Sequence, residues 1–212
     1  MADFMTGASQ DEALPLIKTF HYSRKMPSAS KHCFAWRAEG GFFGDTGEPF
    51  AAAIYGIPVN RHWPKDSVEL QRLVRRDDVD IQLSQFVAWS LRWLKLNADY
   101  SFALSYADTG QGHHGGIYQA TNWVFVGSRD SAHIGFNTPG GFIHGRSCNS
   151  RFGTRSIDKI AIIKPDWVPV YGRPKHLYIY PLKQRLNKIL QRMGWESLPY
   201  PKPEQLKLES SE

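Results

Sequence analysis

Runs of apolar residues in the first half of the chain predict four β-strands. Three short runs of aromatic and aliphatic side chains predict strands over Lys31–Arg37, Phe50–Ile57 and Ser101–Tyr106. The segment Ser67–Arg75 alternates between the two faces of a fourth strand. This alternation places four residues on one face: Val68, Leu70, Arg72 and Val74.

Helical spacing is clearest between residues 80 and 97. Residues of one helical face recur there at the i, i+3, i+4, i+7 and i+8 positions: Phe86, Trp89, Ser90, Trp93 and Leu94. Asp80 or Ser84 is the candidate N-cap of this helix. Shorter helices are predicted over Asp11–Phe20, Ile117–Asn122 and Lys183–Met193.

Strands and helices alternate along the chain, with glycine-rich connections at Gly40–Pro49 and Gly110–Gly116. Further strands are predicted over Trp123–Val126 and His176–Leu182. Between these two strands the pattern is weak apart from the apolar segment Ile157–Ile163. This order of elements predicts an α/β or α+β fold, in which helices flank a mixed sheet.

The composition supports one globular domain. The chain has 212 residues, of which 42% are hydrophobic and 13% aromatic, so it can bury a sizeable core. Its longest apolar stretch, Phe50–Pro58, is too short to span a membrane, and the N-terminal residues lack the apolar region of a secretory signal. Cys33 and Cys148 form no CxxC motif or disulfide framework. We therefore expect a reducing compartment, the cytoplasm, and no membrane partner.

Positive charge is concentrated in the second half of the chain. Residues 1–128 carry 12 basic and 13 acidic residues, a net charge of −1. Residues 129–192 carry 12 basic and 3 acidic residues, a net charge of +9. Such a segment is typical of a surface that binds a polyanion. The alternative is an ordinary solvated basic surface.

Polar residues near the predicted strand ends are candidates for a catalytic site. His21 and Tyr22 follow the first helix, where an imidazole can serve as a ligand, a general base or a helix-terminal cation. Arg72 lies on an apolar strand face and needs an anionic partner, either a carboxylate such as Asp108 or an anionic ligand. Asp108 precedes a glycine-rich loop, a common position for site residues in α/β sheets. Tyr118 is a candidate active-site hydroxyl or a core residue.

Nitrogen and oxygen donors in the same regions raise the question of a metal. His113 and His114 follow Asp108 in the glycine-rich loop. Together with His21 they define a candidate site for a transition metal such as iron. The alternative is a simple turn in which Asp108 caps the next helix.

The segment GRSCNSRFGTRS, residues 145–156, carries three arginines: Arg146, Arg151 and Arg155. Guanidinium groups interleaved with serine, asparagine and one phenylalanine offer phosphate contacts and a stacking ring. With Lys175 further along the chain, these residues predict a surface that contacts a nucleic-acid backbone. The alternative is a loop held by arginine–carboxylate pairs.

In their order, these clusters resemble the motifs of the phage Mom family, enzymes that modify adenine in DNA. The matching motifs are His-Tyr-Ser (21–23), Glu-Leu-Gln-Arg (69–72), a helix beginning near Ser84, Tyr-Ala-Asp (106–108) and Ile-Tyr-Gln-Ala-Thr-Asn-Trp (117–123). They span residues 14–128, and the segments GRSCNSRFGTRS and KHLYIYPL extend the resemblance to residue 182.

The resemblance implies a GNAT-like fold, that of the N-acetyltransferase superfamily, and transfer of a carbamoylmethyl (acetamido) group to adenine N6. The substrate implied is double-stranded DNA, which the modification protects from host restriction, and the group comes from a small-molecule donor. The resemblance associates iron with the activity, with His21 and Asp108 as candidate ligands. The catalytic residues carried over are His21, Tyr22, Arg72, Ser84, Asp108 and Tyr118. A phage-encoded protein of this kind acts in the cytoplasm of the host cell.

The same resemblance implies a domain plan. A GNAT-like catalytic core occupies residues 1–128, and a basic insertion, the final strand and the terminal helix over residues 129–194 complete the same domain. Residues 195–212, with three prolines at alternate positions, form an extended tail.

The segment before the long helix argues against acetyl-CoA as the donor. Relatives that use acetyl-CoA have a glycine-rich turn there, whose N–H groups bind a pyrophosphate. Residues 75–86 contain no glycine, and Asp77, Asp78 and Asp80 repel phosphate. Two other functions stay open: a GNAT-type acyltransferase acting on a protein or a small amine, and a non-catalytic DNA-binding module.

Adenine N6 becomes accessible to an enzyme only when the base leaves the helical stack. Aromatic side chains are the natural groups to hold an extruded base. Trp36, Tyr55 and Trp63 are the candidates, and core packing is the alternative for each.

Overall fold

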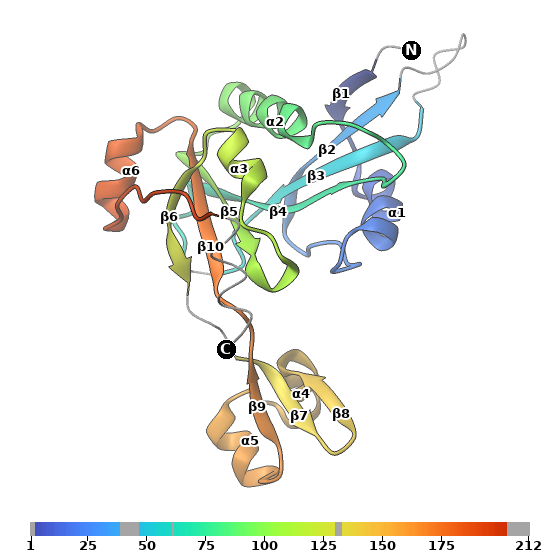
Figure 1. The fold of residues 1–212 in the computed structure, drawn as a ribbon, viewed down its shortest axis with the longest axis vertical. Coiled ribbons are helices and arrows are strands. Elements are labelled where there is room, and N and C mark those ends of the chain that lie inside the picture. Colours follow the sequence, from blue (N-terminus) through green and yellow to red (C-terminus); the bar gives the residue numbers. More distant parts are fainter. Residues whose placement is uncertain (1–2, 39–46, 61, 130–132, 203–212) are drawn as a thin grey trace. The chain divides into compact units, whose positions relative to one another are not determined.

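A computed structural model describes residues 3–38, 47–60, 62–129 and 133–202, which form two compact units (Figure 1). Unit 1 contains residues 1–106, 115–126 and 177–200. Unit 2 contains residues 107–114, 127–176 and 201–212. The basic segment 129–194 is therefore divided, since residues 177–194 belong to unit 1.

A seven-stranded sheet forms the core of the fold, in the order β1-β2-β3-β4-β5-β10-β6. The strands are β1 (Asp3–Gly7), β2 (Ser30–Ala38), β3 (Pro49–Gly56), β4 (Ser67–Arg75), β5 (Phe102–Asp108), β10 (Lys175–Pro181) and β6 (Val124–Arg129). The pairs β1–β2, β2–β3 and β3–β4 are antiparallel, whereas β4 and β5 are parallel. The mixed α/β architecture predicted from the sequence is confirmed.

Helices cover both faces of this sheet in unit 1 (Figure 1). They are α1 (Gln10–Phe20), α2 (Leu83–Asn97), α3 (Gly116–Ala120) and α6 (Leu186–Met193). Helix α1 buries its apolar side against Ile54 and Val74. Helix α2 packs on the opposite face, where Ser90 Oγ lies 2.7 Å from the hydroxyl of Tyr55. Consecutive residues of β3 thus face different helices, as a pleated strand requires.

A β-bulge interrupts the alternation of β4. Arg72 pairs with Ile54 and Leu70 pairs with Tyr55, so Gln71 is an extra residue between two consecutive partners. Because cross-strand partners share a face, Arg72 and Val74 lie on the α1 face and Leu70 lies on the α2 face. The prediction that Val68, Leu70, Arg72 and Val74 share one face is therefore wrong, because Leu70 lies on the opposite face from Arg72 and Val74.

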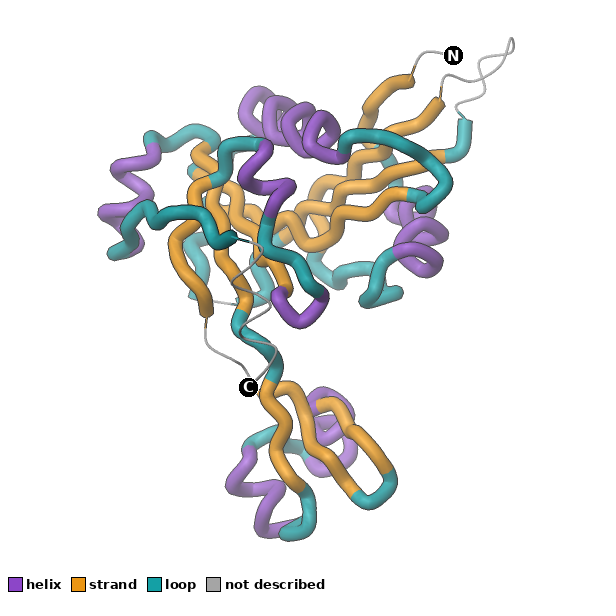
Figure 2. The backbone as a smooth tube through the Cα atoms, viewed as in Figure 1, coloured by secondary structure: helices purple, strands orange, loops and turns teal. Residues whose placement is uncertain are grey.

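Unit 2 contains a small three-stranded sheet of its own, in the order β8-β7-β9 (Figure 2). Its strands are β7 (His133–Thr138), β8 (Gly141–His144) and β9 (Val168–Tyr171), and its helices are α4 (Gly145–Phe152) and α5 (Ile157–Ile163). Phe136, Cys148 and Ile160 form its buried core, with one residue from β7, α4 and α5 respectively. Both helices therefore pack on the same face of this sheet.

Several local predictions are corrected. The N-cap of α2 is Gln82, without a side-chain hydrogen bond, and not Asp80 or Ser84. Strands β1, β7, β8 and β9 and helix α4 were not predicted. Leu198 N–H donates to the Phe125 carbonyl, which ties the start of the predicted tail to the sheet. Most of the predicted connection Gly40–Pro49, and residues 203–212 of the tail, lie outside the described residues.

Candidate functional site

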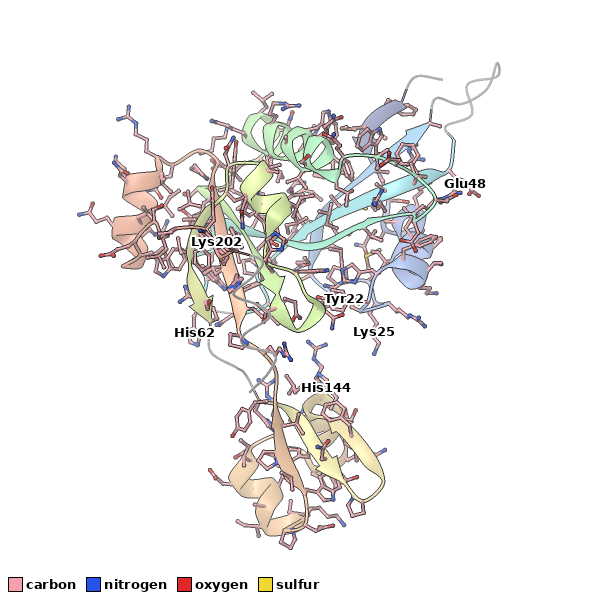
Figure 3. All side chains as sticks on the ribbon, viewed as in Figure 1. Tyr22, Lys25, Glu48, His62, His144 and Lys202 are labelled. Atoms are coloured by element: carbon pink, nitrogen blue, oxygen red, sulfur yellow. The ribbon has the colours of Figure 1, made fainter. Side chains whose placement is uncertain are left out.

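His21 and Tyr22 lie at the C-terminus of α1, in unit 1. A capping box of Ser9 and Glu12 starts α1, and His21 ends it in an extended conformation. The imidazole is 9% exposed, and its ring stacks on Tyr22 at a centroid distance of 4.4 Å. Tyr22 itself is 55% exposed, and Figure 3 labels it together with Lys25 on the segment that follows α1.

The hydrogen bonds of His21 determine its tautomer. The backbone N–H of Ser23 donates to His21 Nδ1 over 3.0 Å, and Ser23 Oγ lies 2.9 Å from the same atom. Since a backbone N–H can only donate, Nδ1 is unprotonated. The neutral ring therefore carries its proton on Nε2.

Arg72 fixes the segment that follows α1 against the bulge in β4. Its Nε donates to the Lys25 carbonyl over 3.1 Å, and its Nη1 donates to the Gln71 carbonyl over 2.6 Å. The sequence predicted an anionic partner for this guanidinium, and these two partners are main-chain carbonyls. Arg72 thereby holds in place the segment that carries His21 and Tyr22.

Tyr118 is a buried hydroxyl on α3. Its oxygen lies 2.8 Å from Ser105 Oγ, which in turn donates to the Leu70 carbonyl over 2.8 Å. Because Ser105 uses its proton on Leu70, Tyr118 is the donor to Ser105. Burial raises the pKa of Tyr118 to about 12, with smaller contributions from Tyr22, Tyr178 and Glu69. Tyr118 therefore stays protonated near neutral pH.

Strands β4 and β5 separate close to these residues. They pair only where Ser67–Glu69 faces Phe102–Leu104. Immediately beyond, the Ser105 hydroxyl bridges to Leu70 in place of a strand ladder. Glu69, at the point of separation, is 8% exposed, and its Oε2 accepts the N–H of Val59. A buried carboxylate of this kind is costly unless hydrogen-bonded.

The sequence reasoning missed Glu69 and Ser105 as members of this site. Glu69 belongs to the Glu-Leu-Gln-Arg motif, so its motif membership was a usable signal. Ser84 is the second residue of α2, and among the described residues its hydroxyl makes no hydrogen bond. Tyr22 and Glu69, which also belong to unit 1, both contribute to the raised pKa of Tyr118.

Asp108 lies in unit 2, at the end of β5. Its Oδ1 accepts the N–H of Gly110 over 3.0 Å, capping a short 3-10 helix (Thr109–Gln111). Its Oδ2 lies 2.6 Å from Lys175 Nζ. The side chain of Asp108 is 17% exposed and that of Lys175 is 47% exposed. The turn proposed as the alternative for Asp108 is thus present, and Lys175 has a carboxylate partner.

The predicted iron ligands are already engaged. Both oxygens of Asp108 and the Nδ1 of His21 take part in the hydrogen bonds and ion pair given above. Within the part of the chain that the structure describes, no group of three or more His, Cys, Asp and Glu side chains could hold a metal ion. Iron binding by His21 and Asp108 stays a prediction.

The three arginines predicted to contact DNA lie on and just after α4. Arg146, Arg151 and Arg155 are exposed. Across residues 3–38, 47–60, 62–129 and 133–202, the ion pairs include none of these guanidinium groups. Residues 133–176 carry 7 basic and 2 acidic residues, a net charge of +5. Unit 2 therefore presents a basic surface.

The three aromatic candidates for stacking on an extruded base are packed in unit 1. Trp36 is 6% exposed and Tyr55 is fully buried. Trp63 packs against Phe102 and Trp195, at centroid distances of 6.4 and 5.4 Å. Trp36 and Tyr55 are therefore too buried to stack on a base. For these two residues the structure shows the alternative, which was core packing.

Two cavities in unit 1 differ in charge. One of about 660 Å³ lies between α1 and the connection from β4 to α2, and its charged lining is mainly acidic: Glu12, Glu48, Asp77 and Asp78, with Arg76 paired to Asp78. The other, of about 570 Å³, is lined by Ser101, Lys183, Gln184, Arg185 and Lys188. The connection that precedes the long helix is therefore acidic in three dimensions as well as in sequence.

The chain matches one protein family over nearly its whole length. The sequence profile of the Mom protein family matches residues 4–202. A search of curated protein sequences gives no match. No helix among the described residues is both long enough and apolar enough to cross a lipid bilayer.

Solved structures with a similar chain path are acetyltransferases. The ribosomal-protein-S18-alanine N-acetyltransferase from Escherichia coli has a TM-score of 0.49 and 8% identity, over 87% of this chain and 96% of that chain. A Bacillus subtilis acetyltransferase in complex with CoA has a TM-score of 0.46 and 12% identity, over 85% and 97%. A GNAT family acetyltransferase from Elizabethkingia anophelis with acetyl-CoA bound has a TM-score of 0.48 and 9% identity, over 85% and 98%. Similarity at this level carries no information on donor or acceptor.

Proposed function

The chain belongs to the Mom protein family, and from this premise we propose that it transfers a carbamoylmethyl group to N6 of adenine in double-stranded DNA. The match over residues 4–202 is the observation that carries the proposal. The polar cluster of unit 1 and the basic surface of unit 2 support it, because this reaction needs both a reactive site and a polyanion-binding surface.

The reaction forms a bond between adenine N6 and the methylene carbon of a carbamoylmethyl donor. N6 loses one proton, and the leaving group of the donor departs with the electron pair of the broken bond. Adenine N6 is paired and stacked in the duplex, so the base has to be extruded at a cost of a few kcal/mol. The protein therefore has to grip the DNA backbone, hold the base and accept a proton.

In this proposal, the residues of unit 1 orient the reactants. His21 and the exposed Tyr22, whose rings stack on each other, orient the base or the donor. The oxygen of Tyr118 keeps acceptor capacity, because its own proton goes to Ser105. Arg72 positions the segment that carries the first two residues.

The proton of N6 needs an acceptor, for which the sequence offered His21 or Asp108. His21 accepts at Nδ1 from Ser23, so proton uptake there requires breaking that contact. Both oxygens of Asp108 already have a partner, the N–H of Gly110 at Oδ1 and Lys175 Nζ at Oδ2. Glu69 is a third candidate, and it is the one whose charge acts on Tyr118. We propose Glu69 as the first of these to test.

The donor in this proposal is a small molecule other than acetyl-CoA. The cavity beside the connection from β4 to α2 is lined by four carboxylates and one guanidinium. Like charges repel a pyrophosphate, whereas a glycine-rich turn would have bound it through backbone N–H groups. Binding of CoA to the purified protein, measured by calorimetry, would instead favour an acyltransferase.

Mass spectrometry of nucleosides tests the proposed function directly. DNA from cells that express the chain should contain an adenosine adduct, and its mass identifies the group. The variant His21→Ala should lower the adduct yield by roughly 100-fold or more, the contribution typical of a positioned acid–base group. His62→Ala, a change at an exposed histidine of unit 1, is the matched control and should leave the yield unchanged. Unmodified adenosine in expressing cells contradicts the proposal.

A further inference from the structure

Helix α4 presents an unusual surface for a short solvent-exposed helix. Cys148, which is fully buried, and the half-buried Phe152 seat it on the core of unit 2. The other side chains of the helix point to solvent: Arg146, Ser147, Asn149, Ser150 and Arg151. The exposed surface thus consists of guanidinium, amide and hydroxyl groups, without a carboxylate or an apolar side chain.

The composition of α4 does not serve helix stability. Exposed helices usually carry carboxylates and cations four residues apart, which attract one another. In α4, serine and asparagine are weak helix formers, and a glycine occupies its first position. The helix is instead fixed at its ends, where His144 Nδ1 accepts the N–H of Arg146 over 3.1 Å and Gly153 terminates it in the left-handed region.

The dimensions of α4 match the major groove of DNA. An eight-residue helix is about 12 Å long, and an α-helix with its side chains is about 10–12 Å wide. The major groove of B-DNA is about 12 Å wide, so it admits such a helix over roughly three to four base pairs. His144, labelled in Figure 3, marks the N-terminal end of α4 in unit 2.

Two side chains on one face of α4 have the chemistry that reads base edges. Arg146 and Asn149 are three residues apart and therefore neighbours on the helix surface. Arginine pairs with O6 and N7 of guanine through two hydrogen bonds, and asparagine pairs with N6 and N7 of adenine. Ser150 is less suited, because its hydroxyl donates to the Arg146 carbonyl over 3.2 Å.

We propose that α4 enters the major groove and that Arg146 and Asn149 read base sequence, so that α4 sets the sequence context in which the protein acts. This inference rests on the proposed function, because it takes duplex DNA as the substrate. Arg151 and Arg155 contact phosphates, which fixes the position of the helix but carries no sequence information. Sequence preference and catalysis are then separable, since Arg146 and Asn149 lie in unit 2 and His21 lies in unit 1.

Selection from a duplex library tests the inference. The full-length protein is incubated with DNA of randomised sequence, and the bound fraction is sequenced. The wild-type protein should enrich a short motif that contains guanine and adenine. Asn149→Ala should reduce discrimination at the adenine position by roughly 5- to 150-fold, the range for one bidentate contact, and Arg146→Ala should do the same at the guanine position. Circular dichroism checks that both variants are folded.

Lys159→Ala is the matched control. Lys159 is an exposed cation on α5 of the same unit, so its removal should weaken binding equally on all sequences or leave it unchanged. Two results overturn the inference while leaving the proposed function intact. One is DNA binding by the wild-type protein without sequence preference, and the other is an unchanged motif in both α4 variants. Absence of any DNA binding overturns the inference and the proposed DNA substrate together.

Discussion

Replacing Tyr118 by phenylalanine separates the structural and chemical uses of one hydroxyl. Tyr118 donates to Ser105 Oγ, and Ser105 donates to the Leu70 carbonyl, each over 2.8 Å. Tyr118→Phe removes only the first of these hydrogen bonds. The ring keeps its contacts with Trp123 and Tyr178, at centroid distances of 5.2 and 5.0 Å.

The burial of Ser105 sets the expected loss of stability. A hydrogen bond contributes about 0.5–1.5 kcal/mol net, and more when its loss leaves a buried partner unsatisfied. Ser105 is 1% exposed, so water does not replace the missing donor. We therefore expect Tyr118→Phe to cost ~1.5–2 kcal/mol. For a chain of this size this corresponds to a fall in Tm of roughly 3–8 °C.

Tryptophan fluorescence during urea unfolding is a suitable assay, because Trp123 packs directly on Tyr118. A double-mutant cycle with Ser105→Ala should give a coupling free energy of about 1 kcal/mol. Additive effects of the two changes, or a variant as stable as the wild type, would refute a stabilising hydrogen bond between Tyr118 and Ser105. At a temperature where Tyr118→Phe is folded, we expect the rate of adenine modification to fall about tenfold or more. An unchanged rate would mean that the hydroxyl of Tyr118 serves only to stabilise the fold.

The pH dependence of stability gives an independent check on Tyr118. Its pKa is raised to about 12, so the folded state holds the phenolic proton more tightly than the unfolded state. The resulting stability is fully present below a pH of about 10 and is lost as the pH rises towards 12. Tyr118→Phe should remove this part of the alkaline destabilisation, while the part due to other buried tyrosines persists.

Three further predictions concern stability and DNA binding. Glu12→Ala leaves the Arg37 side chain, which is 5% exposed, without its carboxylate partner. Removing one partner of a fully buried pair costs ~3–5 kcal/mol, but the Glu12 side chain is 42% exposed. We therefore expect the free energy of unfolding in urea to fall by ~2 kcal/mol. The pKa of Glu12 is lowered to about 2, mainly by the Ser9 backbone N–H, so the difference should shrink as the pH falls from about 4.5 towards 2. Gly115→Ala places a Cβ against the Tyr178 ring at a φ of +90°, so the Tm should fall by several degrees in calorimetry; an unchanged Tm would contradict this backbone conformation. Affinity for duplex DNA should fall roughly tenfold between about 50 and 200 mM salt, and Arg155→Ala should reduce the slope of log K against log salt by about 1; an unchanged slope would remove Arg155 from the phosphate contacts.

The parts of the fold that could be predicted from the sequence are those with a long apolar repeat. Helix α2 is buried along one side, so its periodicity appears in the residues themselves, whereas β4 is buried on both faces over its first four residues. Strand β8 has four residues, of which three are exposed, and helix α4 buries only Gly145 and Cys148. Short elements on the surface of a small unit leave too few buried positions to establish a period.

Edges and caps were harder to predict because they depend on neighbours. Strand β1 is an edge strand that pairs only with β2, so the sheet and not its own composition makes it a strand. Gln82 begins α2 without a side-chain hydrogen bond, although Asp80 and Ser84 nearby are stronger capping residues.

In the candidate site, too, local motifs could be read from the sequence, whereas contacts between distant residues could not. Motif order made Tyr22 and Tyr118 candidates; Tyr22 closely follows α1 and Tyr118 lies in α3, so each position depends on one local helix. Partners could not be identified in this way, because Lys175 lies 67 residues beyond Asp108 in the sequence and meets it only through the pairing of distant segments. The same limit applies to Ser105 and Leu70, which are 35 residues apart.

The bulge in β4 decides which residues reach the site. A strand in strict alternation would put Leu70 beside Arg72, on the face that α1 covers. With Gln71 inserted, Leu70 turns to α2 and its carbonyl receives the Ser105 hydroxyl, while Arg72 stays on the α1 face and reaches the Lys25 carbonyl. Arg72, on one flank of the extra residue Gln71, therefore contacts the segment that carries His21. Leu70, on the other flank, contacts Ser105, which is hydrogen-bonded to Tyr118. Since a bulge has no signature in the hydrophobic pattern, the site follows from the pairing of β3 with β4 and not from β4 alone.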